Sequence, residues 1–173
     1  ELNFAAPCTG RVLHALNIRL FPEQMVYVAN HAEDEVVFVD KSLARLVWPL
    51  FEQFKTVRHI VVMDDGAGEV PEAPAGKDVH DYEELLAAAS PVAFDVRDEN
   101  QAASMCYTSG TTGNPKGVVY SHRSTFLHTY GVLTSGGLGP TEEDRVLPVV
   151  PMFHANAWGL AHAAVACGAD LVM

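Results

Sequence analysis

The segment from Ala102 to Tyr120 reads AASMCYTSGTTGNPKGVVY, and it decides how the rest of the sequence is interpreted. Its two ends, Ala102–Tyr107 and Gly117–Tyr120, are runs of small, β-branched and aromatic residues typical of strands. Between them stand hydroxyl-bearing residues, glycines and the single Lys116. Glycines let backbone N–H groups converge on an anion, hydroxyls donate hydrogen bonds to its oxygens, and a lysine adds a mobile positive charge. Residues 107–117 therefore predict a loop that binds a polyphosphate.

The spacing within this loop differs from that of the common ATPase phosphate loop. The ATPase loop has a second glycine five residues after the first, whereas the residue five positions after Gly110 is Pro115. Gly117 follows Lys116 at the place where the ATPase loop has the Ser or Thr that binds magnesium. A turn rich in Ser, Thr and Gly that binds nothing is the plainer alternative. The length of the arrangement, its one lysine and its flanking strands favour a phosphate loop of another kind.

Strand and helix patterns alternate along most of the chain. The runs Val36–Val39 and Ile60–Met63 predict strands covered on both sides, and the apolar stripe Leu43–Phe54 predicts a helix capped by Ser42 and kinked at Pro49. Residues 64–79 predict a solvated surface loop. Further helices are predicted to begin near Glu1 and at Pro22, and to span residues 82–89 after Asp81, residues 122 to about 134 after Ser121, and residues 157–166. Further strands are predicted at residues 145–150 and 169–173. This alternation predicts the α/β class, with a layered, largely parallel sheet flanked by helices.

Length and charge narrow the possible functions. The chain has 173 residues, which is one domain by the usual size, and its formal net charge is −11, from 11 Lys and Arg against 22 Asp and Glu. A chain this acidic has no general attraction for nucleic acids or for an anionic membrane, although a local cationic spot can still bind a small anion. Its three widely spaced cysteines are typical of reduced thiols in a cytoplasmic protein.

The long apolar stretch from Val146 to Met173 is interpreted as buried core. It is long enough to span a bilayer, but it contains two prolines, two histidines, an asparagine and an aspartate, which are costly or disruptive in hydrocarbon. The N-terminus has neither an initiator Met nor the pattern of a signal peptide. Because both ends cut across predicted elements, we expect the chain to be a fragment.

A second motif, PVVPMFHANAWG at Pro148–Gly159, sets a histidine beside aromatic residues in an apolar segment. With the loop, it makes the sequence resemble the adenylate-forming, or acyl-activating, enzyme superfamily, which includes acyl-CoA synthetases, adenylation domains of peptide synthetases and luciferases. The Asn-Ala-Trp ending is most similar to medium- and long-chain fatty acid–CoA ligases, and Leu16–Leu20 and Asn30–Asp34 point the same way. The resemblance covers essentially the whole chain, residues 1–173, as part of the AMP-binding N-terminal domain.

This resemblance implies ATP-dependent activation of a carboxylic acid, most similar to a fatty acid. The acid and Mg²⁺-bound ATP give an acyl-adenylate and pyrophosphate, and CoA, the co-substrate, then displaces AMP. It further implies catalytic roles for Lys116 and His154, with His154 beside the reacting carboxylate, Trp158 at the mouth of the acyl tunnel, and Thr108 closest to Mg²⁺. The β- and γ-phosphates would be held by Thr108, Ser109, Gly110, Thr111, Thr112, Gly113 and Lys116.

Each implied role has a structural alternative. His154 alone reads as a hydrogen-bonded core histidine, but Phe153 and the Pro151 turn beside it favour a site. Trp158 is as consistent with packing as with a gate. The other seven histidines show no metal-ligand spacing, and Cys106, with no His or Asp constellation near it, is interpreted as a small buried residue and not as a nucleophile.

The resemblance also implies what lies outside this chain. The motifs that bind adenine and ribose, the acidic Mg²⁺ ligand, and the C-terminal domain with its catalytic lysine are absent from residues 1–173, so we expect this piece alone to be inactive. Two alternatives stay open: adenylation of an aryl, short-chain or amino acid, and a nucleotide-binding domain without catalysis. The expected partners are small-molecule substrates and no nucleic acid. The sequence leaves open a homodimer and a peripheral membrane association, and it predicts no transmembrane segment.

Overall fold

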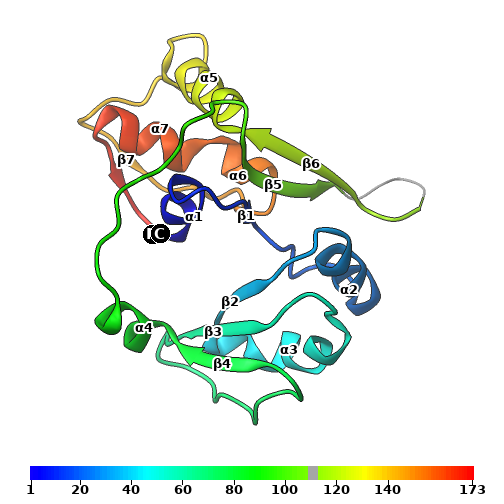
Figure 1. Cartoon of the computed structure of the whole chain (residues 1–173). Coiled ribbons are helices and arrows are strands. Elements are labelled where there is room, and N and C mark those ends of the chain that lie inside the picture. The colour runs from blue at the N-terminus through cyan, green and yellow to red at the C-terminus, as the bar shows by residue number, and fades with distance from the viewer. Residues whose placement is uncertain (109–112) are drawn as a thin grey trace. The chain divides into compact units, whose positions relative to one another are not determined.

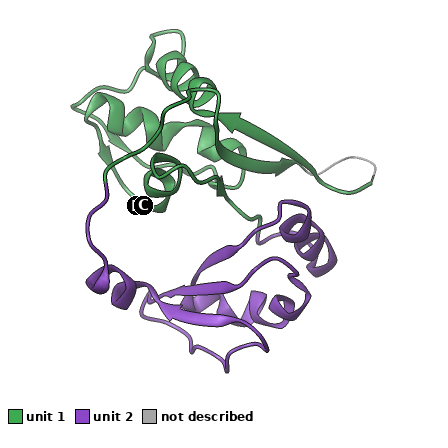
Figure 2. Ribbon diagram, viewed as in Figure 1, with its two compact units in different colours: residues 1–17, 93–173 green, residues 18–92 purple. Residues whose placement is uncertain are grey.

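The computed structural model describes residues 1–108 and 113–173, which divide into two compact units (Figure 2). Unit 1 consists of residues 1–17 and 93–173, and unit 2 consists of residues 18–92. Both units combine parallel strand pairs with helices, so the predicted α/β class is confirmed. No helix within the described ranges has both the length and the apolar character needed to cross a membrane.

Unit 1 is organised around strand β5 (Ala102–Thr108), which lies in the middle of a three-stranded sheet (Figure 1). β5 pairs in parallel with β1 (Leu13–His14) and antiparallel with β6 (Lys116–Ser121). A second, short parallel pair joins β7 (Arg145–Val146) to β8 (Asp170–Leu171). The helices of this unit are α1 (Leu2–Cys8), α5 (His122–Leu133), α6 (Ala155–Trp158) and α7 (Leu160–Cys167).

Local sequence explains where the elements of unit 1 begin and end. The Ser121 side chain accepts a hydrogen bond from the backbone N–H of Ser124, 3.1 Å away, and so caps α5 as predicted. The predicted strand over residues 145–150 is too long, because β7 ends at Val146 and Pro148 has no N–H to donate to a ladder. The predicted helix over 157–166 begins too early, because the structure has α7 from Leu160 to Cys167. Gly159, with a φ of +70°, separates α6 from α7.

Unit 2 holds a parallel sheet in the order β2 (Val36–Asp40), β3 (His59–Met63) and β4 (Asp78–Asp81). Its helices are α2 (Pro22–His31), α3 (Ala44–Val47) and α4 (Tyr82–Ala88), with 3₁₀ turns η1 (Lys41–Leu43) and η2 (Trp48–Gln53) around α3. Strand β4 was not predicted and begins inside the expected loop 64–79. Asp81 does cap α4, since its carboxylate accepts a 2.9 Å hydrogen bond from the Glu84 N–H.

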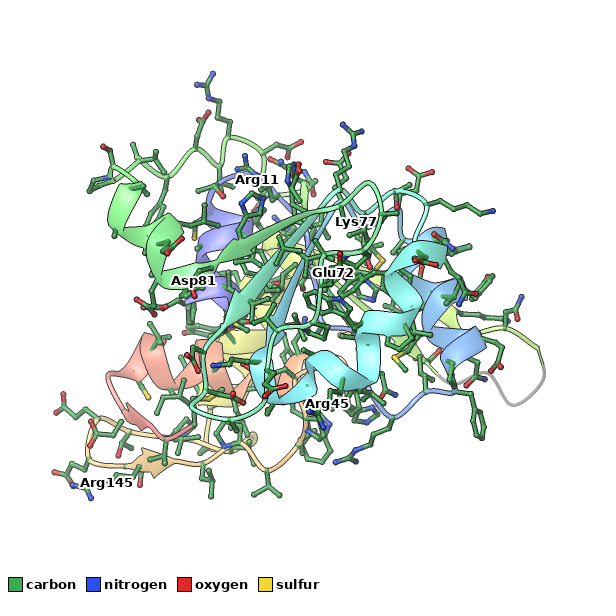
Figure 3. All side chains as sticks on the ribbon, turned by 90° about the horizontal axis from the view of Figure 1, so that it is seen from below. Arg11, Arg45, Glu72, Lys77, Asp81 and Arg145 are labelled. Atoms are coloured by element: carbon green, nitrogen blue, oxygen red, sulfur yellow. The ribbon has the colours of Figure 1, made fainter. Side chains whose placement is uncertain are left out.

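The core of unit 2 is aromatic. Phe51 is fully buried, and its ring meets those of Trp48 and Phe54 edge to face, at centroid distances of 5.5 and 5.4 Å. The long loop is anchored to this core, because the Trp48 indole N–H donates to the Glu72 carbonyl over 2.7 Å and the Lys77 ammonium donates to the carbonyls that follow η2. Figure 3 labels Glu72 and Lys77 of this loop. The loop is therefore fixed by side-chain to backbone bonds instead of being merely solvated.

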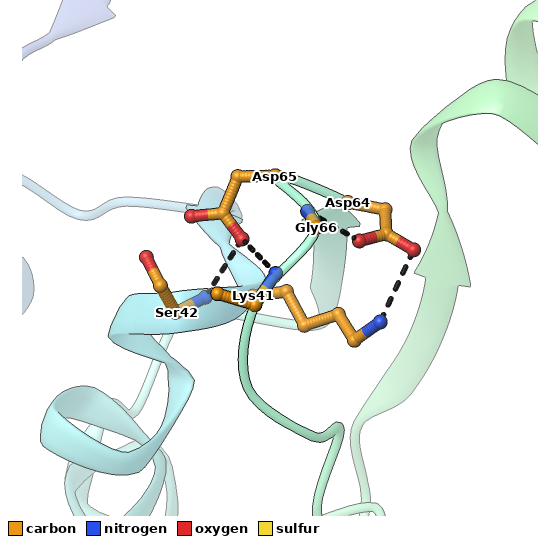
Figure 4. A network of polar contacts seen from close by, with 6 residues as sticks. Lys41, Ser42, Asp64, Asp65 and Gly66 are labelled. Carbon is orange, nitrogen blue, oxygen red and sulfur yellow. Dashed lines mark hydrogen bonds and ion pairs between the residues drawn. The ribbon is translucent and has the colours of Figure 1, made fainter.

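Two predictions about unit 2 need correction. Val36 and Phe38 of β2 are 43% and 39% exposed, so in this chain one face of that strand is uncovered. Ser42 does not cap a helix, because η1 precedes α3. Instead, its N–H donates to the Asp65 carboxylate over 3.2 Å (Figure 4).

The same polar network fixes the first turn of the loop. Asp64 accepts hydrogen bonds from the Gly66 N–H at 2.9 Å and from the Lys41 ammonium at 3.1 Å (Figure 4). The bond from Gly66, and then the lysine, hold the pKa of Asp64 below its ordinary value, and the bond from Ser42 does the same for the pKa of Asp65. Both carboxylates therefore act as ionised acceptors for backbone donors.

We expect Phe51→Ala to destabilise unit 2 by about 3–5 kcal/mol, because it removes a fully buried ring from a close-packed cluster. The chain has two tryptophans, Trp48 in unit 2 and Trp158 in unit 1, so fluorescence in a Trp158→Phe background follows unit 2 alone during urea unfolding. Phe21→Ala is the matched control, since that ring is 74% exposed. Equal midpoints for the two alanine variants would contradict this account of the core.

Candidate functional site

The predicted phosphate loop is the connection between β5 and β6 in the hairpin. Thr108, the last residue of β5, is the direct cross-strand partner of Lys116, the first residue of β6. The Thr108 hydroxyl donates to the Lys116 carbonyl across 3.4 Å. Side chains directly opposite on antiparallel strands share one face of the sheet, so the hydroxyl and the ammonium of this pair are on the same side. The predicted residues Ser109–Thr112 lie outside the described residues.

The end of the loop shows what a polyphosphate requires. Gly113 has a φ of +94°, a conformation that favours glycine. Lys116 is exposed and makes no ion pair with any carboxylate of the described ranges, so its charge is available to a ligand. A hydroxyl, a free ammonium and glycine N–H groups fit phosphate oxygens. Mg²⁺ also fits, if Thr108 supplies one oxygen and the substrate phosphates and water supply the others, because this ion commonly keeps few protein ligands.

The second motif places its two predicted residues at the ends of α6. His154 immediately precedes α6 and is exposed, and Trp158 ends it with 51% of its surface exposed. Both rings are therefore exposed within residues 1–173. Their roles at a carboxylate and at an acyl tunnel stay predictions.

Between them, α6 is a left-handed turn. Its four residues, Ala155 to Trp158, have φ values of +47°, +51°, +50° and +56°. For L-residues this conformation costs roughly 1–2 kcal/mol each. Such a turn persists only where its surroundings hold it. The contacts that do so are therefore part of the architecture of the site.

One set of contacts comes from the buried side chain of Asn156. Its Nδ2 donates to the hydroxyl of Ser104 over 2.8 Å, and its Oδ1 accepts from the thiol of Cys106 over 3.1 Å. All three residues are at most 8% exposed. Burial raises the pKa of the Cys106 thiol, so Cys106 is the small buried residue that the sequence predicts, with an added role as donor. No role for the Asn156 side chain was predicted from the sequence. The signal was a polar residue that tolerates left-handed backbone, next to a glycine in an apolar run.

A second set of contacts comes from His128 on α5. Its Nε2 donates to the carbonyl oxygen of Trp158 over 3.1 Å. The same ring covers Gly159, where an added Cβ would lie 2.7 Å from the His128 Cδ2 atom. Gly159 is thus required by this contact as well as by its positive φ. His128 has no predicted role in the sequence, because nothing at metal-ligand spacing accompanies it.

An apolar cavity of about 310 Å³ also lies in unit 1, between α1, β5, α5 and α7. It contains none of the predicted site residues in its lining. His162 lines it and meets the ring of Phe4 at a centroid distance of 5.2 Å. Burial, and secondly the neighbouring His128, hold the pKa of His162 below its ordinary value. His162 is therefore a neutral wall residue near neutral pH.

Comparison with known proteins shows the family of this chain. A family model described as "AMP-binding enzyme" matches residues 1–173. The long-chain-fatty-acid–CoA ligase of Thermus thermophilus is 47% identical over 174 residues, covering 100% of this chain and 30% of that protein. The 3-methylmercaptopropionyl-CoA ligase of Ruegeria lacuscaerulensis is 44% identical over 178 residues, covering 100% of this chain and 32% of that protein. The chain thus spans about a third of the length of the curated relatives it matches.

Solved structures agree on the fold. A red-emitting luciferase from Phrixothrix hirtus superposes with a TM-score of 0.78 at 22% identity, over 99% of this chain and 33% of the luciferase chain. At this identity the likeness concerns the fold alone.

We expect the stability of unit 1 to fall between pH 7.5 and 5.5, and to fall less in His162→Gln. Because the pKa of His162 is lowered in the folded state, the unfolded protein binds a proton at this residue more readily than the folded protein does. The free energy of unfolding therefore decreases as the pH falls below the ordinary imidazole pKa of about 6.5. Urea midpoints followed by Trp158 fluorescence in a Trp48→Phe background measure this, and His31→Gln in unit 2 is the control. An unchanged slope in His162→Gln would contradict the assignment.

We expect Cys106 to be the slowest of the three thiols to react with iodoacetamide in the folded protein. It is buried with a raised pKa, whereas Cys8 and Cys167 are partly exposed. Peptide mass spectrometry after timed alkylation gives the order, and the same reaction in urea is the control, where the three rates should converge. Preferential labelling of Cys106 would restore a nucleophilic interpretation.

Proposed function

We propose, on the premise that this chain belongs to the AMP-binding enzyme family, that the longer protein activates a carboxylic acid with ATP and transfers the acyl group to CoA. The relatives at 44–47% identity are acid–CoA ligases, which supports this reaction class. The observation that carries the proposal is the pairing of Thr108 with Lys116 at the end of a loop rich in glycine and hydroxyl groups. This pairing places a cationic group and a hydroxyl on the same face of the hairpin.

The chemistry follows from the poor reactivity of a carboxylate. One carboxylate oxygen attacks the α-phosphorus of ATP, the bond to the bridging oxygen breaks, and pyrophosphate leaves. The CoA sulfur then attacks the acyl carbon, loses its proton, and displaces AMP. Mg²⁺ supplies charge neutralisation for the phosphates. Phosphoryl chemistry of this kind depends mainly on positioning and charge. Lys116 and the loop hydroxyls hold the β- and γ-phosphates, so that the leaving pyrophosphate is stabilised as its charge develops.

The second motif, Pro148–Gly159, is proposed to bind the carboxylic acid. His154 is proposed to donate a hydrogen bond to the reacting carboxylate or the α-phosphate, and Trp158 to border the acyl tunnel. The likeness of Pro148–Gly159 to the corresponding motif of fatty acid–CoA ligases supports this. We propose a fatty acid as substrate, as the name of the Thermus relative suggests. A short thioether acid is the second candidate, as in the Ruegeria relative. A panel of acids assayed by pyrophosphate exchange separates these two from aryl and amino acids.

We expect Lys116→Ala and Thr111→Ala in the full-length protein to lower acid-dependent pyrophosphate exchange by about 10²–10³-fold, because each removes a group that binds phosphate charge. Circular dichroism and thermal unfolding should change little, since Lys116 is exposed. Lys55→Ala, an exposed lysine in unit 2, is the matched control and should keep the wild-type rate. Wild-type exchange in both loop variants would exclude the phosphate role.

We expect the 173-residue chain alone to show no pyrophosphate exchange with any acid of the panel, whereas the full-length protein does. The family motifs for adenine and ribose are absent from residues 1–173, so the phosphate loop would have to hold ATP without them. The assay runs both proteins at equal concentration with Mg²⁺. Turnover by the short chain would show that these residues suffice.

A further inference from the structure

We propose that Asn156 is a positioning residue that holds the turn carrying His154 and Trp158 against β5, and so aligns the acid-binding side of the site with the phosphate loop. This inference rests on the proposed function and adds to it a residue that contacts neither the acid nor ATP. Asn156 acts through its neighbours: it fixes the backbone that presents the two rings.

The hydrogen bonds of Asn156 connect the second motif to β5. Ser104 and Cys106, the partners of Asn156 at 2.8 and 3.1 Å, lie on the same strand that ends at Thr108. At a rise of about 3.3 Å per residue, Cys106 is about 7 Å and Ser104 about 13 Å from the end of the strand. Asn156 therefore ties the second motif to the element that leads into the phosphate loop, with no flexible segment between the attachment and Thr108.

The side-chain amide of Asn156 matches the two groups that it contacts. Only a side chain with both a donor and an acceptor can bond the Ser104 hydroxyl through its nitrogen and the Cys106 thiol through its oxygen, and the amide of Asn156 provides both. Asparagine also tolerates left-handed backbone better than most residues, and here its φ is +51°. Leucine has a similar size but offers neither hydrogen bond. It would leave two buried polar groups without their partner.

Loss of Asn156 should affect the acid and ATP differently. The turn is left-handed at four consecutive non-glycine residues, so it relaxes when its attachment is lost. The His128 bond to the Trp158 carbonyl remains and still holds one end of the turn. Relaxation would displace His154, at the end of the turn that His128 does not hold, whereas Thr108 and Lys116 stay paired in the β5–β6 ladder. Loss of Asn156 should therefore impair use of the acid and spare the binding of ATP.

The test uses the full-length protein and steady-state kinetics with each substrate varied. We expect Asn156→Leu to lower kcat/KM for the acid by about tenfold or more, with KM for ATP changed by less than about twofold. Asn30→Leu is the matched control. Asn30 is also a doubly bonded asparagine, to the Gln53 carbonyl at 2.9 Å and from the Lys55 N–H at 2.7 Å, but it lies in unit 2. It should lower stability without changing the ratio of the two KM values.

Partner variants keep the test decisive if Asn156→Leu does not fold. Ser104→Ala and Cys106→Val each remove one bond, and Cys106→Ser keeps a donor and should restore acid kinetics relative to Cys106→Val. Equal losses for acid and ATP in all these variants, or no loss in any, would overturn the positioning role. Wild-type protein without acid-dependent pyrophosphate exchange would instead overturn the proposed function, so the two failures are distinguishable.

Discussion

The antiparallel hydrogen-bond ladder between β5 and β6 is the constraint on which the rest of unit 1 depends. It sets Thr108 opposite Lys116 and fixes both ends of the intervening loop, whatever conformation the loop adopts. Because β5 also pairs in parallel with β1, the hairpin is held from the other side as well. A loop whose ends are fixed loses less entropy on binding a ligand, which is the physical advantage of a hairpin for the proposed phosphate site.

Much of this arrangement could be predicted from the sequence because it depends on local patterns. The strands on either side of the loop, the Ser121 cap of α5 and the Asp81 cap of α4 follow from residue types at fixed spacing, and the structure has them within a residue or two. The apolar stripe Leu43–Phe54 likewise predicted the core of unit 2, although the predicted helix is divided into α3 and 3₁₀ turns. Periodicity reports which face is buried more reliably than it reports helix type.

What the sequence did not predict depends on contacts between distant residues. Strand β4 forms because β3 offers it an edge, and nothing within residues 78–81 alone demands a strand. The left-handed turn at Ala155–Trp158 would be unfavourable by itself, and it exists because Asn156 reaches residues 50 and 52 positions away. His128 joins the same turn from 30 positions away. Local propensity favours an ordinary helix here, so only tertiary contacts could reverse that expectation.

The charge of the chain is compatible with binding a polyanion, although it is −11 overall. At physiological salt, exposed charges more than about 8 Å apart are largely screened from each other, so the net charge of a chain does not decide whether a local site binds an anion. Affinity must then come from groups in direct contact: the Lys116 ammonium, hydroxyls and backbone N–H groups. Their advantage is geometric, because donors already in place need not be reorganised when the anion arrives. In the proposed site, a single exposed lysine beside neutral donors would therefore suffice, and a basic surface is not required.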